Sequence, residues 1–216
     1  MPHRSSALER SRVTWMCTSF GLLWIFSQST AGSATTNPES LQQPATLHDG
    51  QHDFDFSEGT WHTHIVRTLD PFDPNSTSIQ IEGTVSSRKV WGGRAWLEEI
   101  QADTPKGHWE AMNLFLYNPK AHQWSQSFFN SAAGELGARF VGDFKDGRAE
   151  LYAQDTFEDK SILVRAVWSN ISANSHRYEE DFSADGGKTW KLSFIADKTR
   201  ILASEVRPVP NAQPIS

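Results

Sequence analysis

The sequence predicts an all-β protein, a closed antiparallel up-and-down barrel of about ten strands. Short runs of alternating apolar and polar residues recur through residues 52–206, and the helical period of about 3.6 residues is almost absent. Each run ends at a turn signal. Seven of the nine tryptophans lie in this region and supply large apolar surfaces for an interior. Because an open meander leaves two unpaired edges, closure is favoured over the alternative, a ten-stranded sandwich.

Ten runs are interpreted as strands, in chain order. The first five, with the turns that follow two of them, are 61–67, 77–90 before Trp91-Gly92-Gly93, 94–102, 108–117 before Asn118-Pro119-Lys120, and 122–130. The second five are 138–144 before Lys145-Asp146-Gly147, 151–157 before Glu158-Asp159-Lys160, 161–168, 176–183 and 189–196. Tight turns join antiparallel neighbours, so each strand is expected to pair with the next one along the chain.

The first 34 residues differ in character from the rest of the chain. Three arginines precede the apolar run 15–26, and small residues follow at 29–34. This order is typical of a secretory signal peptide, and the apolar run is shorter than the roughly 20 residues that span a bilayer. Residues 1–34 are therefore predicted to direct the protein to a secreted or periplasmic location. The alternative is an uncleaved membrane anchor.

The remaining chain is predicted to hold one folded domain between two polar segments. Residues 35–51 are interpreted as a flexible linker, 52–206 as the β-barrel domain and 207–216 as a disordered tail. Removal of residues 1–34 would take away three arginines and one glutamate, which shifts the net charge from −6 to about −8. This acidic balance argues against binding to nucleic acid, and against binding to anionic membranes once the signal is removed.

The stretch Ser183 to Trp190 has the pattern Ser-x-Asp-x-Gly-x-Thr-Trp and resembles the Asp-box of sialidase propellers. A propeller needs several copies in a longer chain, whereas this sequence holds one copy. Ser183, Asp185 and Gly187 are therefore expected to shape a hairpin turn that Trp190 covers.

The start of the domain resembles that of the calycin barrels, the lipocalin-like superfamily. Gly59-Thr60-Trp61 has the Gly-x-Trp pattern, and the stretch 52–67 is similar to the opening of an uncharacterised bacterial family known only as a domain of unknown function. Further similar stretches are 92–93, 117–119, 123–124, 141–144, 155–157, 165–169, 182–190 and 199–200. The resemblance implies a calycin-like barrel and no established activity. It also implies that Trp61 packs at the barrel floor against Arg200, as a cation over an aromatic ring.

Several residues are candidates for contacts with a ligand inside the barrel. Arg67 and Arg165 lie among apolar neighbours in strand interiors, where an inward guanidinium needs an anionic partner or a ligand carboxylate. Glu99 is predicted to line the same space, with Glu98 or Glu179 as other possible partners for the arginines. Most tryptophans are expected to be core, and Trp124 and Trp168 are predicted to border the pocket. The pairs Glu98-Glu99 and Glu179-Glu180 are otherwise interpreted as surface charge.

No metal, cofactor or nucleophile site is predicted. His62 and His64 share one face of a strand, and Glu82 or another acidic or histidine residue could complete a metal site with them. If Trp61 points inward, however, both histidines point outward. The sequence also has no Gly-x-Ser-x-Gly or His-Glu-x-x-His motif, and its single cysteine, Cys17, lies in the predicted signal peptide.

Three functions are compatible with these features. The favoured one is a secreted barrel that binds a small apolar or aromatic molecule. The second is an enzyme, an isomerase, cyclase or hydrolase, that uses a barrel-lining arginine and glutamate. The third is a filled barrel with a structural or interaction role. An interior cavity of about 300 Å³ or more distinguishes the first two functions from the third.

Overall fold

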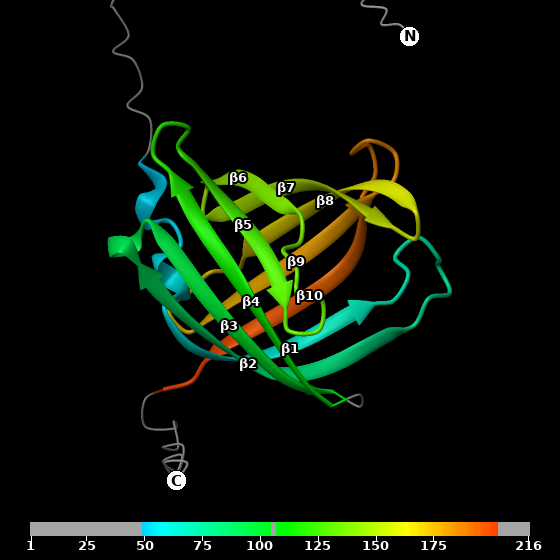
Figure 1. The fold of residues 1–216 in the computed structure, drawn as a ribbon, viewed down its shortest axis with the longest axis horizontal. Helices are drawn as coiled ribbons and strands as arrows, with labels where there is room; N and C mark the ends of the chain where they lie inside the picture. Colours follow the sequence, from blue (N-terminus) through cyan, green and yellow to red (C-terminus); the bar gives the residue numbers. More distant parts are fainter. Residues whose placement is uncertain (1–48, 105–106, 203–216) are drawn as a thin grey trace, which may run out of the picture. The chain divides into compact units, whose positions relative to one another are not determined.

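The structure, a computed structural model, describes residues 49–104 and 107–202, and in this part the chain forms one closed antiparallel barrel (Figure 1). Each strand pairs with the next along the chain, and the first pairs with the last. The strands are β1 (Gly59–Thr68), β2 (Ser78–Val90), β3 (Ala95–Thr104), β4 (Gly107–Asn118), β5 (Gln123–Asn130), β6 (Arg139–Lys145), β7 (Arg148–Phe157), β8 (Lys160–Ser169), β9 (Ser175–Ser183) and β10 (Lys191–Arg200). Three short 3-10 helices are η1 (Gly50–His52), η2 (Asp55–Ser57) and η3 (Trp91–Gly93).

The predicted fold class is confirmed, and the sandwich alternative is excluded by the pairing of β1 with β10. Most strand ends differ slightly from the sequence-based boundaries, and the two largest differences, at the start of β7 and the end of β10, have reasons visible in the pairing. β7 begins at Arg148 because Asp146 and Gly147 both adopt positive φ angles and make a two-residue turn. β10 continues to Arg200 because its last residues pair with the start of β1. No helix of the described part is long and apolar enough to cross a membrane.

The predicted domain boundaries fall largely on residues that the structure does not describe. Residues 1–34 and 207–216 lie outside the described part, as do most of the predicted linker and the end of the predicted domain. The described end of that linker, residues 49–51, packs on the barrel: the backbone N–H of Gly50 donates to the Tyr117 hydroxyl at 2.9 Å, and the Trp124 indole donates to the Gly50 carbonyl at 2.8 Å.

One end of the barrel is closed by the segment that precedes β1. Phe54 is 1% exposed, and its ring lies 5.0–5.3 Å from four aromatic rings of the interior. Those four rings belong to Phe115, Trp124, Phe144 and Trp168. The blue end of the ribbon in Figure 1 shows η1 and η2 at this end. Burial of such an aromatic side chain contributes about 1.5–3 kcal/mol, so this segment belongs to the core.

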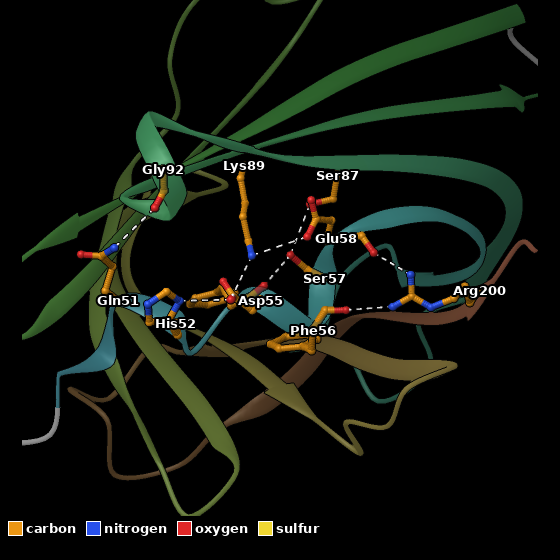
Figure 2. A network of polar contacts seen from close by, with 11 residues as sticks. Gln51, His52, Asp55, Phe56, Ser57, Glu58, Ser87, Lys89, Gly92 and Arg200 are labelled. Atoms are coloured by element: carbon orange, nitrogen blue, oxygen red, sulfur yellow. Dashed lines mark hydrogen bonds and ion pairs between the residues drawn. The ribbon is translucent and has the colours of Figure 1, made fainter. Parts of the chain in front are cut away.

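Polar contacts hold the same segment to the strands around it (Figure 2). Lys89 of β2 forms an ion pair with Asp55 at 2.9 Å, and Ser57 and Ser87 share a hydrogen bond at 3.2 Å. The Gln51 amide donates to the carbonyl of Gly92 at 3.4 Å. The segment is therefore fixed to β2 and η3 as well as inserted into the interior.

Arg200 joins the last strand to the first strand and to the closing segment. Its guanidinium carbon lies 4.0 Å from the ring centroid of Trp61, which is the contact predicted from the sequence. It also donates to the carbonyls of Glu58 at 2.6 Å, Phe56 at 3.2 Å and Ala173 at 2.7 Å (Figure 2 shows the first two).

Gly59 is the glycine of the Gly-x-Trp pattern, and its conformation and surroundings explain why a glycine stands there. Its φ angle is +118°, a conformation that favours glycine. A Cβ atom there would lie 2.6 Å from Nη1 of Arg200, so a side chain would displace the guanidinium. The glycine therefore makes room for the arginine that stacks on Trp61.

We expect Arg200→Met to lower the free energy of unfolding by about 2–4 kcal/mol. The substitution removes a cation–π contact of about 0.5–2 kcal/mol and leaves three carbonyl groups without their donor. Chemical denaturation followed by tryptophan fluorescence measures the change, and Arg88→Met, at an exposed position of β2, is the matched control. Equal stabilities of the two variants would show that Arg200 does not hold the barrel closed.

Candidate functional site

The barrel interior has a filled half and a half that solvent reaches. Strand register gives the direction of each side chain, because every second residue faces the interior. Toward the end closed by η1 and η2 the inward side chains are buried, whereas toward the other end they stay partly exposed. We call the solvent-reached half the vestibule, and its inward-facing residues are Arg67, Ile81, Ile100, Trp109, Phe128, Phe157, Glu180, Phe182 and Phe194.

Large side chains fill the closed half. The largest of those that are fully buried are Trp61, Trp96, Trp124, Trp168, Phe54, Phe115 and Leu151. The rings of Phe54, Phe115, Trp124 and Trp168 contact one another, and Trp96 and Leu151 belong to the same core cluster, so this half is closely packed. The predicted ligand pocket therefore does not extend into this half, and solvent reaches only the vestibule half of the interior.

Neither of two hollows that the described residues line lies in the vestibule. One, of about 490 Å³, lies at the β6–β7 turn beside Asp53 and Phe144. The other, of about 220 Å³, lies beside Asn118 and Arg139, at the edge of β4, β5 and β6. The larger of these two hollows is an indentation at the closed end, and it gives no support to a ligand inside the barrel.

A chain of polar side chains crosses the interior between the filled half and the vestibule. Lys198 of β10 donates to Glu98 of β3 at 2.9 Å, and these side chains are 5% and 3% exposed. Asn113 of β4 donates to the other oxygen of Glu98 at 3.1 Å, and Gln126 of β5 donates to Asn113 at 2.8 Å. The hydrogen bonds offset the cost of burying the ion pair. They also fix four strands to one another across the interior.

The polar chain continues to a carboxyl group in the vestibule. The Tyr178 hydroxyl donates to Oε1 of Glu180 at 2.5 Å, and the Gln126 amide lies near enough to influence the pKa of Tyr178. Burial raises the pKa of Tyr178 well above its usual value, and Glu180 adds to the effect. Burial also raises the pKa of Glu180, although the bond from Tyr178 and the charge of Arg67 oppose the shift. Glu180 therefore keeps its proton to a higher pH than an exposed glutamate does.

Two atoms of this polar layer lack partners within the described chain. They are Oε1 of Gln126 and Oγ1 of Thr63, and both residues are almost completely buried. Buried polar atoms are usually hydrogen-bonded, to protein or to ordered water. The layer below the vestibule therefore has unused hydrogen-bonding capacity.

The β1–β2 loop, residues 69–77, reaches over the mouth of the vestibule. Phe72 of this loop lies 6.0 Å from Phe157 of β7, whose ring lies 5.6 Å from Phe182 of β9. Figure 1 shows the cyan loop near the yellow β7–β8 turn. Asp70 and Ser76 shape the loop through hydrogen bonds to backbone N–H groups. The mouth is therefore partly covered by aromatic rings.

Of the five predicted ligand-contacting residues, Arg67 lies in the vestibule, whereas Glu99 points outward and is exposed. The side chain that points inward is Glu98, because Trp96 occupies the interior and residues two apart share a face. The interpretation of Glu98 and Glu180 as surface charge was therefore wrong.

Arg165 also lies outside the barrel, contrary to the prediction. It pairs with Asp181 at 2.9 Å and stacks over Trp190 at 4.7 Å. The register places its neighbours Val164 and Ala166 inward, so Arg165 cannot line the interior. Desolvation lowers the pKa of Arg165, but the bond and charge of Asp181 outweigh it, and the net pKa is raised.

Trp124 and Trp168 point inward as predicted, but they are 1% and 2% exposed and belong to the filled half. Both pack on Phe54. They are core residues rather than the border of an accessible pocket. The vestibule aromatic residues and Glu180 were missed by the sequence analysis. In β5 the two-residue alternation from the inward Trp124 could have found Phe128, whereas β9 and β10 contain no tryptophan from which to start such a count.

The Asp-box forms the β9–β10 turn, as expected. Asp185 accepts hydrogen bonds from the backbone of Thr189 at 2.9 Å, from its hydroxyl at 2.8 Å and from Ser183, which hold the pKa of Asp185 at about 2. The N–H of Gly187 donates to the Ser183 hydroxyl at 2.8 Å, and Trp190 follows on the outer face. The box therefore shapes a hairpin and lies outside the interior.

His62 and His64 face outward, where both contact the carboxylate of Glu82, at 3.2 and 2.5 Å. Among the residues that the structure describes, no group of three histidine, cysteine or acidic residues is arranged to hold a metal ion. Glu82 therefore forms a hydrogen bond with His64 and a charged contact with His62 when that imidazole is protonated.

Comparisons with known proteins add little to this geometry. No family model matches the sequence, and no curated protein matches it. The solved structures that match include the S-type phycobiliprotein lyase CPES from Guillardia theta, with 8% sequence identity, coverage of 73% of this chain and 95% of that chain, and a TM-score of 0.49. A similarity this low carries no argument about function. The pairing of β1 with β10 establishes a closed ten-stranded barrel, and membership in the calycin superfamily and in the uncharacterised family stays a prediction.

His176 is a buried titratable group at the closed end of the barrel. Its ring lies 4.5 Å from that of Trp61 and 5.0 Å from that of Phe56, and neither ring nitrogen has a partner within the described chain. Burial, with smaller effects from the charges of Lys198 and Arg200, lowers the pKa of His176 to about 2. The folded protein therefore holds this imidazole neutral throughout the mildly acidic range.

We expect His176 to lower the free energy of unfolding by about 2 kcal/mol when the pH falls from 7.5 to 5. In this range the imidazole of the unfolded chain takes up a proton near the ordinary histidine pKa of 6.5, while the folded protein does not, so falling pH favours unfolding. Urea denaturation at both pH values measures the loss. In His176→Leu the difference between the two pH values should shrink by that amount, and an unchanged difference would contradict the assignment.

Proposed function

We propose that the protein binds a small, mainly apolar or aromatic molecule in the vestibule. The observation that carries the proposal is the partial exposure of several inward-facing aromatic rings at the end opposite the closing segment. In a barrel without a ligand function such rings would be expected to pack to completion, as they do in the filled half. Their exposed surface is the surface that a guest would cover.

The vestibule combines apolar walls with polar groups at its base, as small-molecule sites commonly do. Trp109 and Phe128 stack with their ring centroids 6.2 Å apart, and Phe157 and Phe182 form a second pair at 5.6 Å. Glu180 lies at the base with a hydrogen bond to Tyr178. The walls would supply affinity, and the base would orient the ligand.

The filled half limits the size of the ligand. Because the layer from Lys198 to Gln126 is buried and hydrogen-bonded, a guest would have to stop above it. Export of the protein is also part of the proposal, and it rests on the sequence of residues 1–34 alone.

Acid–base catalysis in the vestibule is a second candidate function, favoured by one observation. Glu180 is a half-buried carboxyl group whose raised pKa suits a general acid, and such groups are enriched at catalytic sites. On this hypothesis a molecule recovered from the barrel would be altered by the wild-type protein and unaltered by Glu180→Gln. Native mass spectrometry of both proteins, purified from the same host, compares them.

We expect N-phenyl-1-naphthylamine, a neutral fluorescent aromatic molecule, to bind the protein, and Phe128→Ala to weaken its binding about tenfold. Loss of one aromatic contact of about 1.4 kcal/mol corresponds to that factor. Fluorescence titration measures the affinity. The matched control is Phe129→Ala, because this neighbouring phenylalanine is also partly exposed but faces outward.

Equal affinities of the two variants would place the probe elsewhere and contradict binding in the vestibule. Absence of binding by the wild-type protein would contradict the proposed function for this class of ligand. Melting temperatures of both variants show whether either substitution disturbs the fold.

A further inference from the structure

We infer that the ligand of the vestibule is an organic anion, a carboxylate or sulfonate on an apolar or aromatic body, whose charged group lies between Arg67 and Glu180 and whose binding adds a proton to Glu180. This inference rests on the proposed function and deepens it, because it names the ligand class and the residues that select it.

Arg67 and Glu180 belong to one row of the inner face. Arg67 of β1 pairs with Phe194 of β10, and Phe194 pairs with Glu180 of β9. The three residues therefore lie side by side across three strands and face the same interior. The register therefore places Arg67 and Glu180 on the two sides of Phe194, whose ring offers an apolar surface to the body of a ligand.

Arg67 has its hydrogen-bond donors available. Within the described chain it has no ion pair within 4.0 Å and no hydrogen bond, and its effect on Glu180 is that of a charge at longer range. Arginine presents a planar set of donors that matches a carboxylate or sulfonate. Glu180 in turn uses Oε1 for the bond from Tyr178, and its Oε2 has no partner within the described chain.

The surroundings of Glu180 favour its neutral form when an anion is present. The polar or charged groups that act on it are Tyr178 on its own strand, Arg67 of β1 and Asp155 of β7. Its register partners on the two adjoining strands, Ala166 of β8 and Phe194 of β10, are uncharged. Burial and Asp155 raise the pKa of Glu180, whereas Tyr178 and Arg67 lower it. A bound anion would partly neutralise Arg67 and repel a carboxylate, so both effects add a proton to Glu180.

Anion binding should therefore weaken as pH rises. The neutral Glu180 carboxyl can donate a hydrogen bond to the anion, which the ionised form cannot. Above the pKa of Glu180 in the complex, the anion would meet a second negative charge and lose that donor. Binding and protonation are thus linked, and each should strengthen the other.

Two fluorescent probes with a shared ring system test the inference. The neutral probe is N-phenyl-1-naphthylamine, and the anionic probe, 8-anilinonaphthalene-1-sulfonate, carries an added sulfonate. At pH 6 we expect the anionic probe to bind about tenfold more tightly, which corresponds to one charge-assisted hydrogen bond of about 1.4 kcal/mol. Arg67→Gln should remove this preference, because it should weaken binding of the anionic probe about tenfold more than binding of the neutral probe. Arg88→Gln, at an exposed position on β2, is the control with the same change in charge.

Isothermal titration calorimetry with the anionic probe measures how many protons the protein takes up on binding. Titrations in two buffers of different ionisation enthalpy should give a proton uptake above zero, which Glu180→Gln abolishes and Glu99→Gln, at an outward-facing position, preserves. Should Glu180→Gln be unstable, Tyr178→Phe serves as a second variant. It removes the bond that lowers the pKa of Glu180, so the pH midpoint for anion binding should rise.

The outcomes separate this inference from the proposed function. If both probes bind equally and Arg67→Gln changes neither affinity, the anion inference is overturned while binding in the vestibule stands. Tighter binding of 1-naphthylmethylammonium, a cationic probe, would also overturn it and point to Glu180 and Asp155 as the selecting groups. Binding of none of the three probes would overturn both proposals.

Discussion

The contact between the first and last strands is the constraint on which the rest of the structure depends. Trp61 and Arg200 are register partners at the junction of β1 and β10, and the guanidinium lies over the indole ring. Arg200 also holds the closing segment through the carbonyls of Phe56 and Glu58. Since Gly59 leaves space for this guanidinium, one local arrangement closes the sheet and anchors the segment that fills its end.

Because the barrel is closed, the inward or outward direction of the side chains on one strand fixes the direction of those on all the other strands. Once Trp61 faces inward, pairing around the ring decides that Glu98, Tyr178 and Glu180 face inward too. Aromatic rings fill the closed half, and a hydrogen-bonded polar layer separates it from the vestibule. The residues that stabilise the fold thus lie mainly at the closed end of the interior, and the residues of the proposed binding site lie at the other end.

Most of the fold could be predicted from the sequence, because turn signals and alternation indicate ten separate strands in the order that the structure has them. The inward direction of Trp61, and hence the outward direction of His62 and His64, followed from the same pattern. The site was predicted less well. Where two charged residues are adjacent, as at Glu98-Glu99, the local sequence does not show which one is buried, and an arginine such as Arg165 has apolar neighbours on either face. The bond between Tyr178 and Glu180 depends on interior packing, which periodicity does not encode.

Residue-resolved amide hydrogen exchange tests closure most directly. In a closed barrel the amides of β1 alternate between partners on β2 and on β10, so all interior positions of β1 should be protected and exchange at similar slow rates. The account predicts the same uniform protection along β10. Fast exchange of every second amide in these two strands, as at the free edges of an open sheet, would contradict it.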